Sequence, residues 1–287
     1  MKGIILAGGD GTRLSPITTS YSKQLLPVFD KPLIYYPLST LMKMNIREIL
    51  IIVKSHQKSN FVNLLGDGKK FGIKISYSTQ DKPNGIAEAL IIGNKFINKD
   101  SVALILGDNI FYGQDVKKNL DSIQFKNGAI VFLYKVKNPS QYGVANIVNS
   151  KLIKITEKPK KTKSNLAVTG LYIYDNNVVK YVKDLKPSKR KELEITDLNN
   201  MYIKKNKLNY VTLKESSVWF DAGTPTSLLL ASQYIQALQE RNNILVSSPE
   251  EIALTKRYIK KEVMKIHIKK EPKNLYYDYL KDILRKQ

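Results

Sequence analysis

Apolar and polar residues alternate along the first half of the chain in blocks that predict strands and helices in turn. Short apolar or alternating runs predict buried strands at 2–7, 48–53, 73–78 and 102–106. Helical spacing of apolar residues predicts helices over 32–45, 61–65 and 84–97, the last with Asn84 near its N-terminus. This order predicts an open, mostly parallel, doubly wound α/β sheet, in which ligands bind beyond the carboxyl ends of the strands.

The second half of the chain contains more strand and ends in helices. Strands are predicted at 129–136, 152–156, 166–174 and 208–213, and helices at 193–203 and 226–240. From about Ser247 the pattern is helical, and Ser248-Pro249-Glu250-Glu251 has the form of a capping box with proline at the first helical position. The chain shows no internal repeat and no low-complexity linker.

Composition excludes several kinds of chemistry. The chain has no cysteine, which rules out disulfides, thiolate nucleophiles and cysteine-ligated zinc. Its two histidines, His56 and His267, are too few for a histidine-rich metal site. No run approaches the roughly 18 apolar residues that span a bilayer, and the first apolar run ends at Gly8, too early for a signal peptide. We therefore expect a cytoplasmic protein with no membrane partner.

The formal net charge of +22 would suit a protein that binds nucleic acid. The basic residues, however, are mostly lysines spread along the whole chain. Arginine, which reads phosphate and guanine with a rigid fork of donors, is scarce. We interpret the lysines as a solvated surface and predict no nucleic-acid partner. The positive field still attracts anionic small molecules, including nucleotides.

A glycine-rich segment follows the first predicted strand. In Gly8-Gly9-Asp10-Gly11-Thr12-Arg13, three glycines in four residues permit a tight turn that exposes backbone N–H groups to anionic oxygens. The segment is not a Walker A loop, and Leu14 stands where a dinucleotide-binding fingerprint has its third glycine. An ordinary glycine-rich turn is the alternative interpretation, but Thr12, Arg13 and the nearby Lys23 favour phosphate binding.

Two aspartates follow apolar runs that lie far apart in the chain. Asp108 comes after the predicted strand 102–106, and Asp221 ends the run 218–220. Mg²⁺ usually takes one or two carboxylates together with phosphate oxygens, so the two aspartates are candidate metal ligands. Each could instead cap the turn that follows it.

Ordered motifs along essentially the whole chain resemble those of the sugar-1-phosphate nucleotidylyltransferase family. They are MKGIILAGG (1–9), SKQLLP (22–27), YYPLST (35–40), GDNIFYG (107–113), EKP (157–159), VTGLY (168–172), ELEITD (192–197) and PEEIA (249–253). The resemblance implies a Rossmann-like nucleotidyltransferase fold with a smaller sugar-binding β region and C-terminal helices. It also implies condensation of dTTP with glucose 1-phosphate to give dTDP-glucose and pyrophosphate, by Mg²⁺-dependent in-line displacement at the α-phosphorus. This reaction is the first step of dTDP-rhamnose synthesis.

The resemblance assigns a role to each matched position. The nucleotide would contact Gly8, Gly11, Thr12, Arg13, Lys23, Gln24, Gln80, Gly85 and Asp108, with Gln80 and Gly85 on the base. The sugar phosphate would contact Asn109, Gly143, Glu157, Lys158, Val168, Tyr172 and Arg190. Asp108 and Asp221 would hold Mg²⁺, while Arg13, Lys23 and Lys158 would serve catalysis by offsetting the charge of the two anions. Without the resemblance, Gln80, Glu157 and Tyr172 would be interpreted as turn, surface and core residues.

Some positions depart from the residues that are usual in the family. Asp10 stands where the family often has serine, so its carboxylate must point away from a triphosphate or lie near the metal. Ala145-Asn146 stands where a Val-Glu pair is common, which puts sugar contacts there in doubt. Ala222 replaces a usual threonine after the second aspartate, and we expect this change to be tolerated.

We expect a nucleotidyltransferase domain over residues 1–246 and a C-terminal helical extension over 247–287. Within the domain, a nucleotide part covers about 1–127 and a sugar-phosphate part about 128–246. The resemblance also implies a homotetramer with feedback inhibition at a separate site. Two alternatives remain open, a uridylyltransferase that uses UTP and a catalytically silent regulatory homologue that binds sugar nucleotides.

Overall fold

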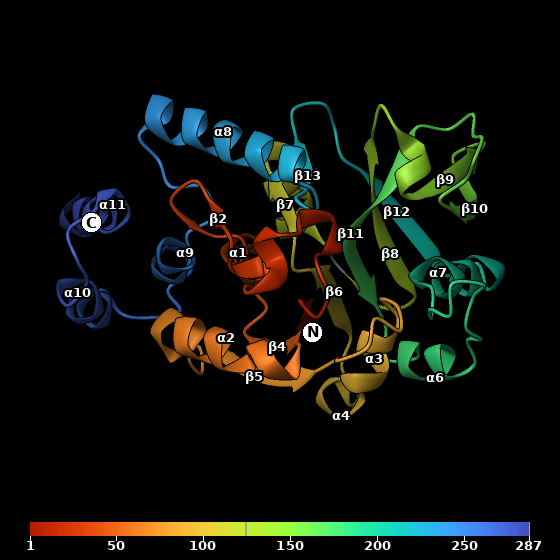
Figure 1. Cartoon of the computed structure of the whole chain (residues 1–287), viewed down its shortest axis with the longest axis horizontal. Helices are drawn as coiled ribbons and strands as arrows, with labels where there is room; N and C mark the ends of the chain where they lie inside the picture. Colours follow the sequence, from red (N-terminus) through yellow and green to blue (C-terminus); the bar gives the residue numbers. More distant parts are fainter. Residues whose placement is uncertain (124, 287) are drawn as a thin grey trace.

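The computed structural model describes residues 1–123 and 125–286, and a nine-stranded mixed sheet runs through its centre (Figure 1). Four parallel strands form one half of this sheet, in the spatial order β6, β1, β4, β5. They are β1 (Lys2–Leu6), β4 (Glu48–Val53), β5 (Lys74–Thr79) and β6 (Val102–Leu106). These are the four strands that the apolar runs of the first half predicted, shifted by one residue at most.

The antiparallel half of the sheet begins at β11 (Leu166–Tyr174), which runs antiparallel to β6. On one side β11 pairs with β8 (Ala129–Lys135), which in turn pairs with β12 (Leu208–Thr212). On the other side β11 meets β9 (Gly143–Val148), which pairs with β10 (Lys151–Glu157). The doubly wound α/β class is therefore confirmed, with the parallel pairing concentrated in the first half of the chain.

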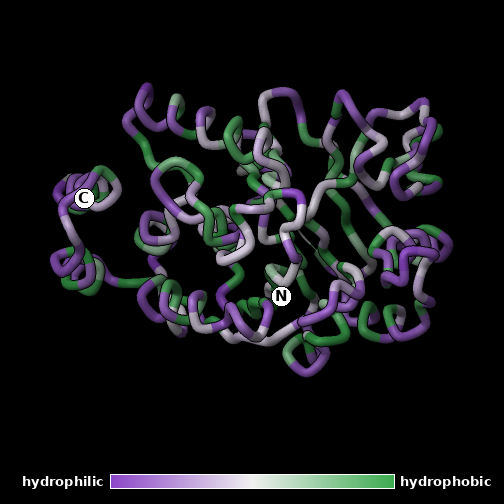
Figure 2. Tube along the Cα trace, viewed as in Figure 1, coloured by the Kyte–Doolittle hydropathy of each residue, from purple (hydrophilic) through white to green (hydrophobic). Residues whose placement is uncertain are grey.

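Helices cover both faces of the sheet because β1 alternates its side chains between two apolar cores. Ile5 belongs to one core and Ile4 to the other. The helices on the first core include α1 (Tyr35–Lys43), α2 (Lys58–Leu65) and α5 (Gln114–Ser122), and three helices near the end of the chain also pack on it. Those on the second are α3 (Glu88–Ile92), α4 (Asn94–Ile97), α6 (Val178–Lys183) and α7 (Ile195–Lys204). Figure 2 shows hydrophobic positions along the central strands and mixed positions along the outer helices.

The last part of the chain wraps the α1 side of the molecule. It contains α8 (Pro225–Asn242), α9 (Pro249–Thr255), α10 (Lys261–Lys269) and α11 (Leu275–Lys286), the last two at one end of the molecule (Figure 1). The Ser248 hydroxyl accepts from the Glu251 N–H at 3.2 Å, which confirms the predicted N-cap of α9. Among the described residues, no helix combines the length and the apolar character that crossing a bilayer requires.

Small elements complete the fold. Strand β7 (Asn109–Tyr112) pairs with β13 (Val218–Asp221), and β2 (Pro27–Val28) pairs with β3 (Lys31–Pro32). Short 3-10 turns cover Thr12–Leu14, Ile17–Thr19, Lys23–Leu25, Ser55–Gln57, Lys69–Phe71 and Pro139–Gln141. Neither β7 nor β9 was predicted, because neither segment shows a clear alternation of apolar and polar residues.

The helix predicted over 84–97 differs from the one observed. It begins at Glu88 and is divided at Gly93, where a Cβ atom would lie 2.6 Å from the Ile4 side chain. The close approach of Gly93 to β1 leaves no room for a side chain there, and the helix that the amphipathic pattern suggests is continuous is divided at this glycine. Asn84 does not cap it, because its amide donates to the Glu88 side chain at 2.7 Å.

Candidate active site

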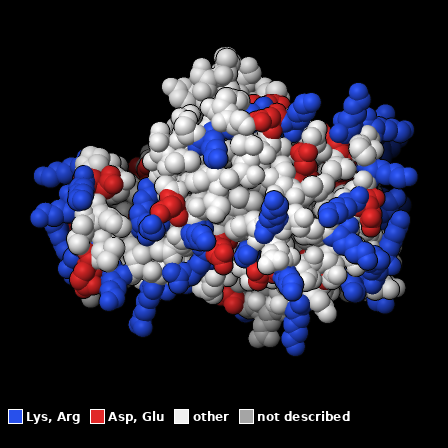
Figure 3. Space-filling view, turned by 90° about the horizontal axis from the view of Figure 1, so that it is seen from below, with Lys and Arg blue, Asp and Glu red and all other residues white. Residues whose placement is uncertain are grey.

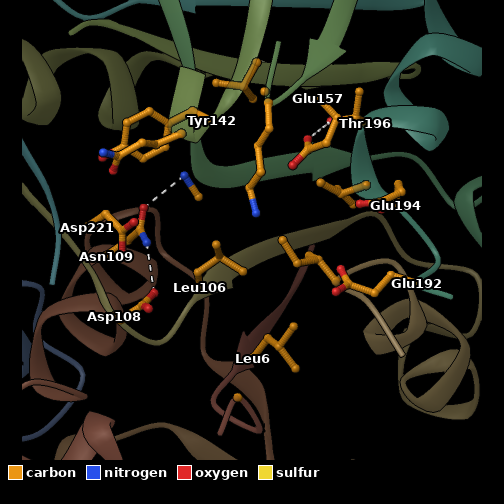
Figure 4. A pocket seen from close by; sticks show the side chains of 18 of the residues that line it. Leu6, Leu106, Asp108, Asn109, Tyr142, Glu157, Glu192, Glu194, Thr196 and Asp221 are labelled. Carbon is orange, nitrogen blue, oxygen red and sulfur yellow. Dashed lines mark hydrogen bonds between the residues drawn. The ribbon is translucent and has the colours of Figure 1, made fainter. Parts of the chain in front are cut away.

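A cavity of about 780 Å³ opens beyond the carboxyl ends of β1 and β6, where ligands bind in sheets of this kind. This volume lies within the roughly 300–1,000 Å³ that is typical of small-ligand sites. One end of the cavity is formed by the glycine-rich loop and by the residues at the ends of β6 and β13. The other end is formed by β9, β10, β11 and the start of α7 (Figure 4). The cavity therefore lies between the parallel and antiparallel halves of the sheet.

The two aspartates singled out in the sequence meet at this cavity. Asp108 follows β6, and the next strand, β7, pairs antiparallel with β13 so that Asn109 lies opposite Asp221. The N–H of Ala222 also donates to the main-chain carbonyl of Asp108 at 3.0 Å. Burial and the charge of Asp108 together raise the pKa of Asp221 to about 6. The β7–β13 ladder thus brings together two carboxylates that are far apart in the chain.

The Asp108 carboxylate is held from both sides. Lys23 forms an ion pair with its Oδ2, and the Asn109 Nδ2 donates to its Oδ1 at 3.0 Å. Burial opposes ionisation, but the Lys23 ammonium and the Asn109 amide outweigh it, so the pKa of Asp108 lies below its ordinary value. Asn109 is fixed in turn, because its Oδ1 accepts from Trp219 Nε1 at 2.6 Å and from the Gly170 N–H at 3.0 Å. One buried asparagine therefore ties this carboxylate to β11 and β13.

The glycine-rich loop after β1 lies beside the aspartates. Gly11 adopts a φ of +63°, a conformation that favours glycine, and a 3-10 turn follows it. A terminal nitrogen of Arg13 lies 3.9 Å from an Asp221 oxygen. Lys23, ten residues further on, reaches Asp108. The loop backbone and two basic side chains thus converge on the aspartate pair.

The residues predicted to contact the base lie on or against the loop after β5. Gln80 is buried, and its Nε2 donates to Glu88 at 2.6 Å and to the Gly85 carbonyl at 3.3 Å. A Cβ built on Gly8 would lie 3.3 Å from the Gln80 Oε1, so the glycine-rich loop packs directly on this amide. Ile86 of the same loop lines the cavity. The predicted nucleotide contacts that do not line it are Gly8, Gly11, Thr12, Gln80 and Gly85, whereas Arg13, Lys23, Gln24 and Asp108 do.

Gly85 joins this loop to the far end of the cavity. It adopts a φ of +104°, and a Cβ there would lie 2.4 Å from the carbonyl oxygen of Leu193. The Leu193 N–H donates to the Asn84 carbonyl at 2.6 Å, and the Ala87 N–H donates to the Leu193 carbonyl at 3.2 Å. Because no side chain fits between these two backbones, the loop after β5 and the segment before α7 are locked together.

All the residues predicted to contact the sugar phosphate line the cavity. They are Asn109, Gly143, Glu157, Lys158, Val168, Tyr172 and Arg190. Glu157 accepts a hydrogen bond from the Thr196 hydroxyl at 2.6 Å (Figure 4). A Cβ on Gly143 would lie 3.1 Å from that hydroxyl oxygen and 3.4 Å from Glu157 Oε2. The glycine therefore leaves this polar pair open to a ligand.

Arg190 is one of the residues predicted to contact the sugar phosphate, and in this structure its guanidinium faces three glutamates. Glu194 binds it through both oxygens, with Nε to Oε1 at 3.1 Å and a terminal nitrogen to Oε2 at 2.7 Å. Oxygens of Glu157 and Glu192 lie 3.3 and 3.7 Å from the same terminal nitrogen. Ser188 also donates to Glu194 at 2.7 Å. The side chain of Arg190 is thus held at the cavity wall by a preformed set of carboxylates.

Several cavity residues received no role from the sequence. They are Tyr142, Glu192, Glu194, Thr196 and Trp219. Sequence features could have pointed to four of these residues. Glu192, Glu194 and Thr196 are polar residues at the start of a predicted helix, and Trp219 lies two residues before Asp221. Tyr142 has no such feature beyond its position next to a glycine. By contrast, Ala145 and Asn146, where sugar contacts were in doubt, do not line the cavity.

Acidic side chains outnumber basic ones in the cavity lining. The basic residues are Arg13, Lys23, Lys158 and Arg190, and the acidic ones are Asp108, Glu157, Glu192, Glu194 and Asp221. The net charge of +22 therefore does not arise here. Figure 3 shows lysines and arginines scattered over the face in view, with acidic residues among them. Two phosphorylated ligands in this cavity would require a further cation.

A divalent cation fits the residues that are present. Asp108 and Asp221 offer carboxylate oxygens on the cavity wall, and burial together with the charge of Asp108 raises the pKa of Asp221, so a nearby cation would stabilise both carboxylates in their charged form. Throughout the described residues there is no cluster of three or more His, Cys, Asp or Glu side chains suited to a metal. Two carboxylates suit an ion that completes its shell with water and phosphate oxygens.

Fold and site together are those of an α/β protein whose cavity is suited to phosphorylated ligands and a divalent cation. The chain matches the nucleotidyl transferase family over residues 2–237, and it belongs to that family. It is 49% identical to the glucose-1-phosphate thymidylyltransferase of Neisseria meningitidis serogroup A and 46% identical to that of Mycobacterium tuberculosis, in both cases over 100% of each chain.

Solved structures agree with this assignment. A Bacillus anthracis protein assigned as a glucose-1-phosphate thymidylyltransferase and crystallised with sucrose superposes with a TM-score of 0.78 at 44% identity. The match covers 88% of this chain and 99% of that one. A UDP-glucose pyrophosphorylase in complex with UDP-glucose superposes with a TM-score of 0.72 at 26% identity, covering 83% of this chain and 98% of that one.

Proposed function

We propose that this protein condenses dTTP with glucose 1-phosphate to give dTDP-glucose and pyrophosphate. The observation that carries the proposal is the meeting of Asp108 and Asp221 beside the glycine-rich loop, at one end of a cavity whose other end presents Glu157, Lys158 and Arg190. The choice of substrates is supported by the full-length relatives at 46–49% identity that are named glucose-1-phosphate thymidylyltransferase.

The reaction is an in-line displacement that needs no general base. A phosphate oxygen of glucose 1-phosphate attacks the α-phosphorus of dTTP, and the bond to the bridging oxygen breaks as pyrophosphate leaves. A phosphate monoester has a second pKa of about 6, so the nucleophile is already largely a dianion at pH 7. This agrees with a cavity whose lining includes neither of the two histidines.

The main obstacle is the repulsion between two anions, and the cavity residues reduce it. Arg13 and Lys23 lie at the glycine-loop end, and Lys158 is exposed at the other end. Backbone N–H groups of the loop hold the triphosphate in line for attack. Asp108 and Asp221 would hold Mg²⁺, which when bound supplies positive charge to the reacting phosphates.

The sugar would be recognised by polar groups on β9, β10 and α7. Glu157 accepts from Thr196 in this structure, and its carboxylate can accept from two sugar hydroxyls at once. This carboxylate is partly buried, and a sugar that lacks the matching hydroxyl leaves it with one hydrogen bond unmade, at a cost of about 1–3 kcal/mol. Gly143 provides the space beside it.

A pyrophosphate-release assay over a matrix of nucleotides and sugar phosphates tests the proposal. We expect turnover with dTTP and glucose 1-phosphate in Mg²⁺, and none in EDTA. A direct competition between dTTP and UTP decides the choice of base, and dominant use of UTP would overturn the thymidylyl assignment. No pyrophosphate release with any pair of substrates would overturn the enzyme proposal in favour of a silent homologue.

Three further expectations accompany the proposed reaction. The division at residue 127 leaves the parallel strands β1, β4, β5 and β6 in the nucleotide part and β8 to β12 in the sugar-phosphate part, which supports the predicted division within the domain. Action in the cytoplasm is an expectation from the sequence, and assembly as a homotetramer is implied by the family resemblance. Size-exclusion chromatography with light scattering tests the tetramer, and a monomer would contradict it.

A further inference from the structure

The loops after three neighbouring parallel strands lie together at the nucleotide end of the cavity. The N–H of Ala7, after β1, donates to the Ile52 carbonyl at 2.7 Å, and the Gln80 N–H, after β5, donates to the Val53 carbonyl at 2.9 Å. The loop after β4 therefore lies between the glycine-rich loop and the loop that carries Gln80. Its first residue is Lys54.

Lys54 reaches across to the glycine-rich loop and forms an ion pair with Asp10. Its side chain is only 16% exposed, whereas that of Asp10 is 37% exposed. The backbone beside Lys54 is fixed, because the N–H and hydroxyl of Ser55 donate to the Asp81 carboxylate at 2.8 and 2.7 Å. This ion pair thus joins a partly buried lysine on a fixed backbone to the middle of the loop.

The position of Asp10 presents an electrostatic problem for the proposed function. It places a carboxylate among Gly8, Gly11, Thr12 and Arg13, the residues expected to hold a triphosphate. The negative charges of the Asp10 carboxylate and of a triphosphate bound to this loop would repel each other strongly wherever solvent screens them incompletely. Among the described residues, Asp10 forms one ion pair, and that pair is with Lys54. Lys54 itself does not line the cavity.

We propose that Lys54 is a positioning residue for the nucleotide site, because it neutralises Asp10 and holds that carboxylate away from the triphosphate. The inference rests on the proposed function, since it assumes that the glycine-rich loop binds dTTP. It extends that function by assigning Lys54 and Asp10 a joint role, in which the lysine is needed only because the aspartate is present.

A double-mutant cycle with Lys54→Met and Asp10→Asn tests the proposal. Lys54→Met leaves Asp10 uncompensated, so we expect the KM for dTTP to rise about tenfold, with kcat and the KM for glucose 1-phosphate within about twofold of wild type. The effect shrinks at high ionic strength, because salt screens the repulsion. Asp10→Asn alone lowers the KM for dTTP about threefold, and the double variant returns it to near the wild-type value.

Matched controls separate this role from a general effect. Lys82→Met removes the charge of an exposed lysine on the neighbouring loop and leaves the KM for dTTP unchanged. Circular dichroism and thermal melting of each variant show whether it is folded, and equilibrium binding of dTTP by calorimetry reports on the site without turnover.

The outcomes are distinguishable from failure of the proposed function. If wild-type protein neither binds nor turns over dTTP, the proposed function fails and the cycle has no baseline. If wild type is active but Lys54→Met leaves the KM for dTTP unchanged, the positioning role is wrong. If the double variant stays as weak as Lys54→Met, Lys54 contacts the phosphates itself, and the joint role is overturned.

Discussion

The two ends of the cavity are built in different ways. At the nucleotide end, loops that follow parallel strands bring backbone N–H groups together with three basic residues, and each of these residues faces one acid: Lys23 with Asp108, Arg13 with Asp221, and Lys54 with Asp10. At the sugar end, side chains from antiparallel strands and α7 form a connected network in which one arginine faces three glutamates. The first end is organised by the sheet itself and the second by side-chain contacts. Substitutions at the first end should therefore impair dTTP binding or the chemical step, and those at the second should impair sugar-phosphate binding.

The largest effect is expected for Asp108→Asn. The amide cannot provide the negative charge that a divalent cation requires, so we expect kcat to fall by about 10³-fold or more while the fold stays intact. Pyrophosphate release in Mg²⁺ measures kcat, and circular dichroism shows whether the variant is folded. Asp100→Asn is the matched control, because it removes the same charge at an exposed site where Asp100 pairs with Lys2. Wild-type turnover in EDTA would contradict the metal role.

Arg13→Ala tests the nucleotide end without replacing either proposed metal ligand. The Arg13 side chain lies near Asp221 and more than half of it is exposed to the cavity and solvent, so its charge is available to the phosphates. We expect kcat to fall about 100-fold, which is typical of losing one preorganised group that stabilises developing charge. Steady-state kinetics with both substrates should show an unchanged KM for glucose 1-phosphate. A rise in that KM with kcat preserved would move Arg13 to the other end of the cavity.

Glu194→Gln tests the sugar end. Glu194 binds the Arg190 guanidinium through both oxygens, so its neutral analogue releases that side chain from the cavity wall. We expect the KM for glucose 1-phosphate to rise about tenfold, the loss expected for one charge-assisted contact, with the KM for dTTP unchanged. Glu192→Gln is the control and should have a smaller effect, because its oxygen lies 3.7 Å from the guanidinium. If the two variants behave alike, the paired contact of Glu194 is not what positions Arg190.

The difference between the two ends of the cavity also explains how much of the fold and of the site the sequence predicts. Strands β1, β4 and β6 are largely apolar, β5 alternates between apolar and polar residues, and a parallel sheet places the carboxyl ends of such strands at one edge. The convergence of loop, Asp108 and nearby basic groups could therefore be anticipated. The network around Arg190 could not, because it depends on the register of β9 and β10 and on a loop with Lys191 in a left-handed conformation. Sequence motifs located Glu192 and Glu194 but did not indicate that they face an arginine.

Gly85→Ala is expected to have the smallest kinetic effect, but it acts on both ends at once. A Cβ there meets the Leu193 backbone, which leads directly to Glu194, while the Gly85 carbonyl accepts from the base-side Gln80. We expect both KM values to rise about two- to fivefold and the free energy of unfolding to fall by about 1–3 kcal/mol, because a strained φ and a backbone contact must both be accommodated. Urea denaturation measures the loss of stability, and kinetics with each substrate varied in turn measures the two KM values.

A substitution at a second glycine distinguishes the effect of backbone strain from the effect of a steric contact. Gly66 also has a positive φ, +61°, but a Cβ built on it meets nothing within 4 Å. Gly66→Ala should therefore lower stability by about 1 kcal/mol through backbone strain alone, and leave both KM values unchanged. If Gly85→Ala changes only the KM for dTTP, a disturbance at the contact between Gly85 and Leu193 does not reach Arg190. The two ends of the cavity then act independently. If both KM values rise together, the close approach of the Gly85 and Leu193 backbones is what holds the two ends of the cavity in their correct relative position.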